Sequence, residues 1–170
     1  FENFIVGRSN RLAYSAATRA AEEDGAFAPL FIHGTCGLGK THLLRAAATR
    51  FLERRPGSVV RITTAEAFTN EFVQAVRGGS VEPFRRSYRR VDLLCVDDVH
   101  FFASKEATQS ELLHTLDAVA MDGARILLAS DEHPKEIAKL SERLVSRFMS
   151  GAVVQIDPPE PELRLRLVKH

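Results

Sequence analysis

Short apolar runs alternate along this chain with segments of helical period. The apolar runs predict five strands, at residues 30–33, 59–63, 91–96, 126–129 and 153–156. The helical segments lie between them, at residues 41–52, 84–90, 106–120, 134–140 and 142–148, and a further helix begins after Pro158 and Pro159. Because strands that alternate with helices form parallel sheets, the pattern predicts an α/β domain.

One more helix follows the second predicted strand. Thr63 and Glu66 have the spacing of a capping box, which predicts the N-terminus of this helix, and Gly78-Gly79 predicts its end. Its apolar side chains recur at helical spacing and predict a buried face: Phe68, Phe72, Val73 and Val76.

Composition limits the possible classes of protein. The chain has 170 residues, of which 45% are hydrophobic and 26% charged, as expected for one globular domain with a core. It has no apolar window long enough for a membrane span. The net charge of +1 is small for a domain that binds duplex DNA mainly through phosphates, so any DNA contact should be local or made by another domain. The two cysteines, Cys36 and Cys95, lack metal-ligand spacing, and we expect reduced thiols in a cytoplasmic protein.

Residues 34–41 have the phosphate-loop pattern G-x-x-x-x-G-K-T, between a predicted strand and a predicted helix. The glycines let the backbone curl so that successive N–H groups point at one phosphate, and Lys40 neutralises the charge of the β- and γ-phosphates. The Thr41 hydroxyl is a ligand for Mg²⁺, and the helix that follows contributes its N-terminal dipole. The pattern therefore predicts a site for a nucleoside triphosphate with Mg²⁺.

Two carboxylates, Asp97 and Asp98, follow the third apolar run. We expect Asp97 to hold the outer shell of the metal through water, and Asp98 to orient or deprotonate the attacking water. The alternative is that both acids only solvate the end of a strand. Their place on a strand separate from a phosphate loop favours the catalytic interpretation.

Polar residues also follow the fourth apolar run, at the sheet edge where ligands bind in α/β folds. Ser130 and Asp131 are candidates for sensing the γ-phosphate, and the alternative is that Asp131 caps the next predicted helix. Arg143 and Arg147 lie four residues apart on one helix face. Arginine can stabilise charge on a transferring phosphoryl group, although the spacing alone favours a solvated basic face.

Several ordered blocks of the sequence resemble one family, the AAA+ domains of DnaA, the bacterial chromosomal replication initiators. The resemblance runs from about Phe1 to Leu167, and its blocks are residues 3–10, 29–34, 37–44, 91–98, 130–137 and 143–148. It implies an αβα sandwich with a five-stranded parallel sheet in the order 5-1-4-3-2. It also implies a nucleotide-binding domain at residues 1–157, an initiator-specific helical insertion near residues 64–90, and the truncated start of a helical lid at residues 158–170.

The resemblance also implies roles for individual residues. The segment around Ile5, Val6 and Asn10 would help to enclose the adenine of ATP or ADP, and Asp131 would be the sensor-1 residue. Arg147 would be the arginine finger that reaches a neighbouring subunit, and Arg143 would support that contact. The nucleotide would lie against Asn10, Gly34, Gly37, Leu38, Gly39, Lys40, Thr41 and His42, with Mg²⁺ at Thr41 and Asp97.

The insertion in this family shapes an open helical filament and contacts single-stranded DNA. Val73 and Lys105 match positions implicated in that contact, whereas Ala107 stands where the family has a basic residue. Core packing of Val73 and simple solvation of Lys105 are the competing explanations. His100 replaces a common glutamine, and the sensor-2 arginine and the duplex-reading helix-turn-helix of the family are expected outside these residues.

The sequence is compatible with two functions. The first is the ATP switch of a replication initiator with slow hydrolysis, which self-associates through ATP, binds origin DNA and works with the replicative helicase machinery. The second is a paralogous regulator that binds nucleotide and a protein partner without opening DNA. The intact phosphate loop and the insertion favour the initiator, and the blocks at residues 3–10 and 143–148 argue against a helicase loader.

Overall fold

A five-stranded parallel sheet forms the centre of the computed structural model, which describes residues 1, 4–24 and 29–168. The order is β2-β3-β4-β1-β5, the order that the resemblance predicts when read from the opposite edge. The strands are β1 (Leu30–His33), β2 (Val60–Thr64), β3 (Leu93–Asp97), β4 (Arg125–Ser130) and β5 (Ala152–Gln155). All five predicted strands are confirmed within two residues at either end. Asn3, in the first block of the resemblance, lies outside the described residues.

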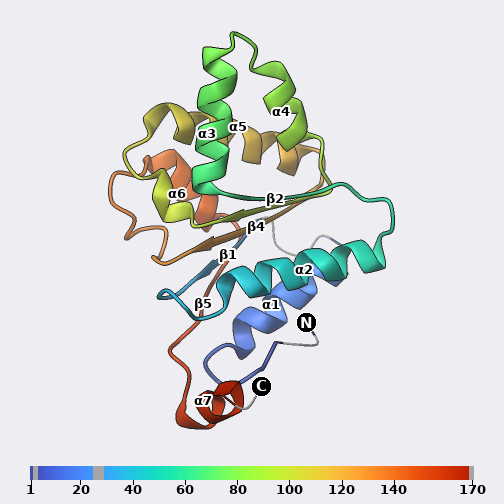
Figure 1. Cartoon of the computed structure of the whole chain (residues 1–170), viewed down its shortest axis with the longest axis vertical. Helices are drawn as coiled ribbons and strands as arrows, with labels where there is room; N and C mark the ends of the chain where they lie inside the picture. Colours follow the sequence, from blue (N-terminus) through green and yellow to red (C-terminus); the bar gives the residue numbers. More distant parts are fainter. Residues whose placement is uncertain (2–3, 25–28, 169–170) are drawn as a thin grey trace.

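Helices cover both faces of the sheet (Figure 1). One face carries α1 (Arg11–Glu22) and α2 (Lys40–Arg54). The other carries α3 (Ala65–Arg77), α4 (Glu82–Arg89), α5 (Glu106–Met121) and α6 (Glu142–Met149), and α7 (Pro161–Val168) lies beyond β5 near α1. None of the helices in the described ranges is long and apolar enough to cross a membrane.

The alternation of side chains along each strand produces two cores. In β3, Leu93 and Cys95 pack toward α1 and α2, whereas Leu94 and Val96 pack toward α3 to α6. Both sets are fully buried, so this central strand is apolar on both faces. The continuous apolar run that predicted β3 therefore reflects two cores.

The first helix, α1, was not predicted. Its buried face is made only of small side chains: Ala13, Ala16, Ala17, Ala20 and Ala21. Alanine lets α1 and α2 approach closely, but it contributes little to a pattern based on large apolar residues.

The predicted cap of α3 was wrong by one residue. Thr64 is the N-cap, and its Oγ1 accepts a hydrogen bond from Ala67 N at 3.1 Å. Thr63 is buried instead, with its hydroxyl 3.3 Å from the Tyr88 hydroxyl of α4. The last residue of β2 therefore serves as the cap, and Thr63 joins the strand to the helical pair.

The helix predicted at residues 134–140 is absent from this described segment, which forms turns. Lys139 has φ 56°, a left-handed conformation that stops a right-handed helix. The Lys139 carbonyl accepts hydrogen bonds from Ser104 N and from the Gln109 side chain. Tertiary hydrogen bonds have therefore replaced helical ones here.

Candidate nucleotide site

The phosphate loop connects β1 to the N-terminus of α2, as predicted. Gly39 immediately precedes the helix with φ 88°, a conformation that favours glycine. Gly34 lies so close to β5 that an added Cβ would collide with the Ile156 carbonyl oxygen. Both glycines are therefore required by the shape of this loop, and its N–H groups lie at the positive end of the α2 dipole.

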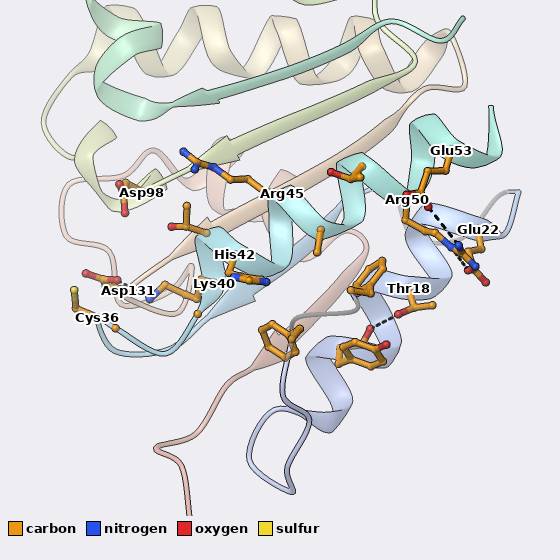
Figure 2. A pocket seen from close by; sticks show the side chains of 18 residues that line it. Thr18, Glu22, Cys36, Lys40, His42, Arg45, Arg50, Glu53, Asp98 and Asp131 are labelled. Carbon is orange, nitrogen blue, oxygen red and sulfur yellow. Dashed lines mark hydrogen bonds and ion pairs between the residues drawn. The ribbon is translucent and has the colours of Figure 1, made fainter. Parts of the chain in front are cut away.

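Lys40 and Asp131 form the centre of the site (Figure 2). The Lys40 side chain is 6% exposed, and its Nζ lies 2.8 Å from Asp131 Oδ1. The same ammonium donates hydrogen bonds to the carbonyls of Gly34 and Thr35, at 2.6 and 2.9 Å. The alternative role of Asp131 as a helix cap was wrong, because turns follow it and its carboxylate pairs with Lys40.

Thr41 and Asp97 meet although they are 56 residues apart in sequence. The Thr41 hydroxyl donates to Asp97 Oδ2 at 2.5 Å, and Asp97 Oδ1 accepts a hydrogen bond from Asp98 N at 2.8 Å. A hydroxyl and a carboxylate side by side are hard oxygen ligands of the type that Mg²⁺ prefers. The pair thus fits the predicted metal position.

Asp98 faces the same cavity, of about 1240 Å³, as Lys40 and Asp131. Its φ of 55° turns the chain sharply after β3 and starts the short 3-10 helix η1 (Val99–Phe102). Partial burial raises the pKa of Asp98, and the nearby carboxylates of Asp97 and Asp131 raise it further. A carboxylate with a raised pKa is a better proton acceptor for water than an ordinary aspartate.

His100 lies next to Asp131 on the η1 side of the cavity. Its Nδ1 accepts a hydrogen bond from Asp131 N at 3.2 Å, so the neutral imidazole carries its proton on Nε2. That Nε2 is 3.6 Å from Asp131 Oδ2. His100, Asp98 and Asp131 lie close enough together to suggest a metal cluster, but Nε2 carries the proton and the Nδ1 lone pair already accepts the Asp131 N–H. His100 therefore orients Asp131.

A second, smaller cavity of about 160 Å³ lies beside the phosphate loop and suits a flat apolar ring. Its walls come from the N-terminal segment, the loop, the residues after β5 and α7: Phe4, Ile5, Ser9, Asn10, Gly37, Leu38, Gly39, His42, Ile156, Asp157, Pro159, Leu163 and Leu167. Six residues of the expected set therefore line this cavity: Ile5, Asn10, Gly37, Leu38, Gly39 and His42. Val6 instead offers its carbonyl to Arg166 Nη1, at 3.1 Å.

The walls of this smaller cavity are held by polar contacts that the sequence did not reveal. The Asn10 amide donates to Ile5 O at 3.0 Å, and its Oδ1 accepts a hydrogen bond from Gly7 N at 2.9 Å. Glu160 accepts a hydrogen bond from Arg8 N at 2.7 Å, which ties the approach to α7 to the N-terminal segment. The Asn10 side chain thus fixes the backbone of the N-terminal segment that lines this cavity.

Arg143 and Arg147 line a different cavity, of about 530 Å³, between α5 and α6. Arg147 Nε forms an ion pair with Asp117 Oδ1 at 2.9 Å, but without the geometry of a hydrogen bond. The Nη1 group of Arg147 donates a hydrogen bond to Ser150 Oγ at 3.0 Å. These arginines lie on the opposite side of the sheet from α2. A role at a nucleotide would therefore require the site of another subunit.

Residues 64–90, where the insertion is predicted, contain the helices α3 and α4, which project from the sheet (Figure 1). Phe68 of α3 packs edge-on against Phe84 and Tyr88 of α4, at 5.1 and 4.8 Å between ring centroids. Val73 and Val76 are 36% and 51% exposed, so the buried face predicted for α3 is wrong at its C-terminal half. Core packing therefore does not explain a valine at position 73. Lys105 and Ala107 lie at the start of α5.

Comparison with known families agrees with this geometry. A family described as the bacterial DnaA ATPase domain matches residues 1–155. The chain belongs to this family. Among DnaA proteins, the chromosomal replication initiator of Levilactobacillus brevis is 48% identical over 171 residues, and that of Sulfurimonas denitrificans is 46% identical. Each alignment covers 100% of this chain, which spans 38% and 39% of the length of these two relatives.

Solved DnaA structures share the whole fold. Domain III of the Thermotoga maritima protein has a TM-score of 0.96 at 39% identity, over 99% of this chain and 70% of that one. AMPPCP-bound DnaA from Aquifex aeolicus has a TM-score of 0.92 at 41% identity, over 99% and 52%. A DnaA bound to both AMPPCP and single-stranded DNA reaches 0.91 at 41% identity, over the same shares of the two chains. The DnaC helicase loader, at 14% identity and a TM-score of 0.74, shares the fold alone.

Proposed function

We propose that this chain is the ATP-binding and ATP-hydrolysing domain of a chromosomal replication initiator. The observation that carries the proposal is the buried Lys40 ammonium, held among loop carbonyls and Asp131 beside the Thr41–Asp97 pair. The names of the curated relatives and the AMPPCP-bound Aquifex structure support it. The domain division is part of the proposal: residues 1–157 bind the nucleotide, residues 64–90 form the insertion, and residues 158–170 begin a lid.

The site residues would divide the work of hydrolysis. Lys40 exchanges its carbonyl and carboxylate partners for phosphate oxygens, because the several negative charges of a triphosphate attract the ammonium more strongly than two neutral carbonyls and one singly charged carboxylate do. Asp98 orients the attacking water and accepts its proton, and Asp131 contacts the γ-phosphate region from β4. Mg²⁺ held by Thr41 and Asp97 would supply charge neutralisation at the phosphates. The adenine occupies the smaller cavity.

The switch would operate between subunits. Arg147, supported by Arg143, reaches the ATP of a neighbouring copy and makes self-association depend on ATP rather than ADP. Hydrolysis is slow in a single subunit because the arginine lies on the far side of its own sheet. Val73 on the exposed face of α3 and Lys105 at the start of α5 contact single-stranded origin DNA, a role supported by the DNA-bound relative. The assembled protein then serves the replicative helicase machinery.

Titration with a fluorescent ATP analogue tests the site. Lys40→Ala should weaken binding by about 100-fold or more, since it removes a charged phosphate contact from a largely buried position. Lys135→Ala is the matched control and should bind like the wild type, because Lys135 is exposed in the turns that follow β4. Equal affinity of all three proteins would contradict the site assignment.

Sedimentation of the longest natural protein that contains this domain tests the switch. Arg147→Ala should bind ATP normally but lose ATP-dependent assembly. ATP-dependent assembly equal to that of the wild type would remove the subunit-bridging role, and would favour the regulator that binds nucleotide without forming a filament.

A further inference from the structure

The side chain of Gln109, in the first turn of α5, is only 3% exposed and uses its whole amide group in hydrogen bonds. Nε2 donates to Phe102 O at 2.8 Å and to Lys139 O at 2.9 Å. Oε1 accepts a hydrogen bond from Ser141 N at 2.9 Å. One amide therefore joins three backbone segments: the end of η1, the turns that precede α6, and the start of α6 itself.

Two of these segments begin at the nucleotide site. Phe102 ends η1, which directly follows Asp97 and Asp98. Lys139 lies in the turn segment that begins at Asp131, the partner of Lys40. Displacement of either strand end therefore has a direct path to the Gln109 side chain.

The third segment begins the helix that carries the two arginines. Ser141 is the N-cap of α6, and its Oγ accepts a hydrogen bond from Leu144 N at 3.3 Å. Its backbone N–H is the group bonded to Gln109. Gln109 therefore contacts the residue that fixes the start of α6, within two residues of Arg143.

The backbone around Gln109 is strained. Ser104 and Lys139 have φ values of 65° and 56°, unusual for residues with a side chain, and Ser104 N donates to Lys139 O at 3.2 Å. Such conformations persist where the surroundings fix them, and they cluster at active sites and switch segments. The Gln109 amide is the buried group that fixes this one.

We propose that Gln109 is a positioning residue that transmits the state of the phosphate site to α6. The inference rests on the proposed function, because ATP would draw Lys40 away from Asp131 and free the start of the turn segment. Movement of that segment would reach α6 through the Lys139 carbonyl and the Ser141 N–H, and change how Arg143 and Arg147 are presented to a neighbouring subunit. Coupling of this kind requires two arrangements that ATP distinguishes.

Hydrogen exchange of residues 141–149 with and without Mg-ATP, in the longest natural protein that contains this domain, tests the proposal. In the wild type, ATP should change these exchange rates by about fivefold or more, the lower end of typical coupling. Gln109→Met keeps the volume and removes all three hydrogen bonds, so the change should disappear. Thr115→Val is the matched control, since Thr115 is buried in the same helix and its hydroxyl has no hydrogen-bond partner among the described residues.

Gln109→Glu separates coupling from folding. Burial and the two facing carbonyls oppose ionisation, so the variant carboxyl group stays neutral: it still accepts the Ser141 N–H but has one proton to donate to two carbonyls. α6 should therefore exchange like the wild type without ATP and respond less to ATP. The affinity for ATP should stay within about threefold in all four proteins, because Gln109 lies outside the nucleotide cavities.

The outcomes distinguish the two ideas. A wild type that fails to bind ATP would overturn the proposed function and this inference together. Normal ATP binding with no response in α6, or with the same response in Gln109→Met and Gln109→Glu as in the wild type, would overturn only the coupling role.

Discussion

Glu111 of α5 holds the projecting helix pair to the domain, and its removal should destabilise the whole fold. Its side chain is 4% exposed. Arg85 of α4 donates to it twice, from Nε at 3.1 Å and from Nη2 at 3.0 Å, and Arg89 donates once, from Nη2 at 2.9 Å. Glu111→Ala removes the acceptor of all three hydrogen bonds and leaves both guanidinium groups against α5.

The loss of stability in Glu111→Ala depends on how exposed Arg85 and Arg89 are. A hydrogen bond to a charged group contributes about 1.5–3 kcal/mol, so three fully buried bonds would contribute roughly 5–9 kcal/mol. The Arg85 and Arg89 side chains are 40% and 29% exposed, however, so water replaces part of what is lost. We therefore expect a loss of about 3 kcal/mol in the free energy of unfolding, which lowers the Tm by about 6–12 °C in a chain of this size.

Urea unfolding and calorimetry measure this loss directly. Glu111→Gln retains one acceptor oxygen and should lose about half as much. Glu53→Gln is the control, because Glu53 pairs with Arg50 at 3.3 Å with side chains 58% and 42% exposed, and such a pair contributes less than about 0.5 kcal/mol. If Glu111→Ala costs no more than Glu53→Gln, the network does not stabilise the attachment of α4.

Three further measurements address other parts of the molecule. Maleimide should label Cys36 rapidly and Cys95 hardly at all, because Cys36 is exposed while burial raises the pKa of Cys95 to about 12. ATP should slow the labelling of Cys36 about tenfold or more. Equal labelling rates with and without ATP would contradict the place of Cys36 in the phosphate loop. Hydrogen bonds from Arg8 N and neighbouring N–H groups lower the pKa of Glu160 from 4.5 to about 2, so its contribution to stability is complete above pH 4.5 and is lost as the pH falls through about 2. The stability difference between wild type and Glu160→Gln should shrink over that interval, and a constant difference would show that the carboxylate charge is irrelevant. Thr115→Val should stabilise the chain by about 1 kcal/mol in urea unfolding, since it removes a buried hydroxyl that has no partner in the described part of the chain. A loss of stability would indicate an unrecognised hydrogen bond.

The parts of the fold that were predictable are those with a strong local signal. The run from Leu93 to Val96 is apolar at every position, and the phosphate-loop pattern combines glycines with Lys40 at a spacing that few other structures require. The corresponding strands, and the loop between β1 and α2, are therefore placed correctly. The end of α3 at Gly78 was predictable for the same reason.

The remaining features depend on residues that meet only after folding. The turns at residues 134–140 have an apolar pattern compatible with a helix, and the hydrogen bonds from Ser104 and Gln109 to Lys139 decide against it. Glu160 and Gln109 resemble ordinary polar residues in the sequence, because nothing local marks the backbone groups that they bind. Such partners are accessible only from a structure.

The sheet order explains how separate motifs become one site. The strand β4 lies between β3 and β1, so Asp131 at its carboxyl end is beside the phosphate loop and pairs with Lys40. Asp97 is one strand farther away, yet it reaches Thr41 because α2 starts at the loop and crosses over β4 toward β3. A sheet in which β3 and β4 exchanged places would bring Asp97 to the lysine and leave Asp131 at the distance where the metal ligand is needed. The proposed roles, sensor for Asp131 and outer-shell metal contact for Asp97, therefore depend on topology, since both residues are aspartates.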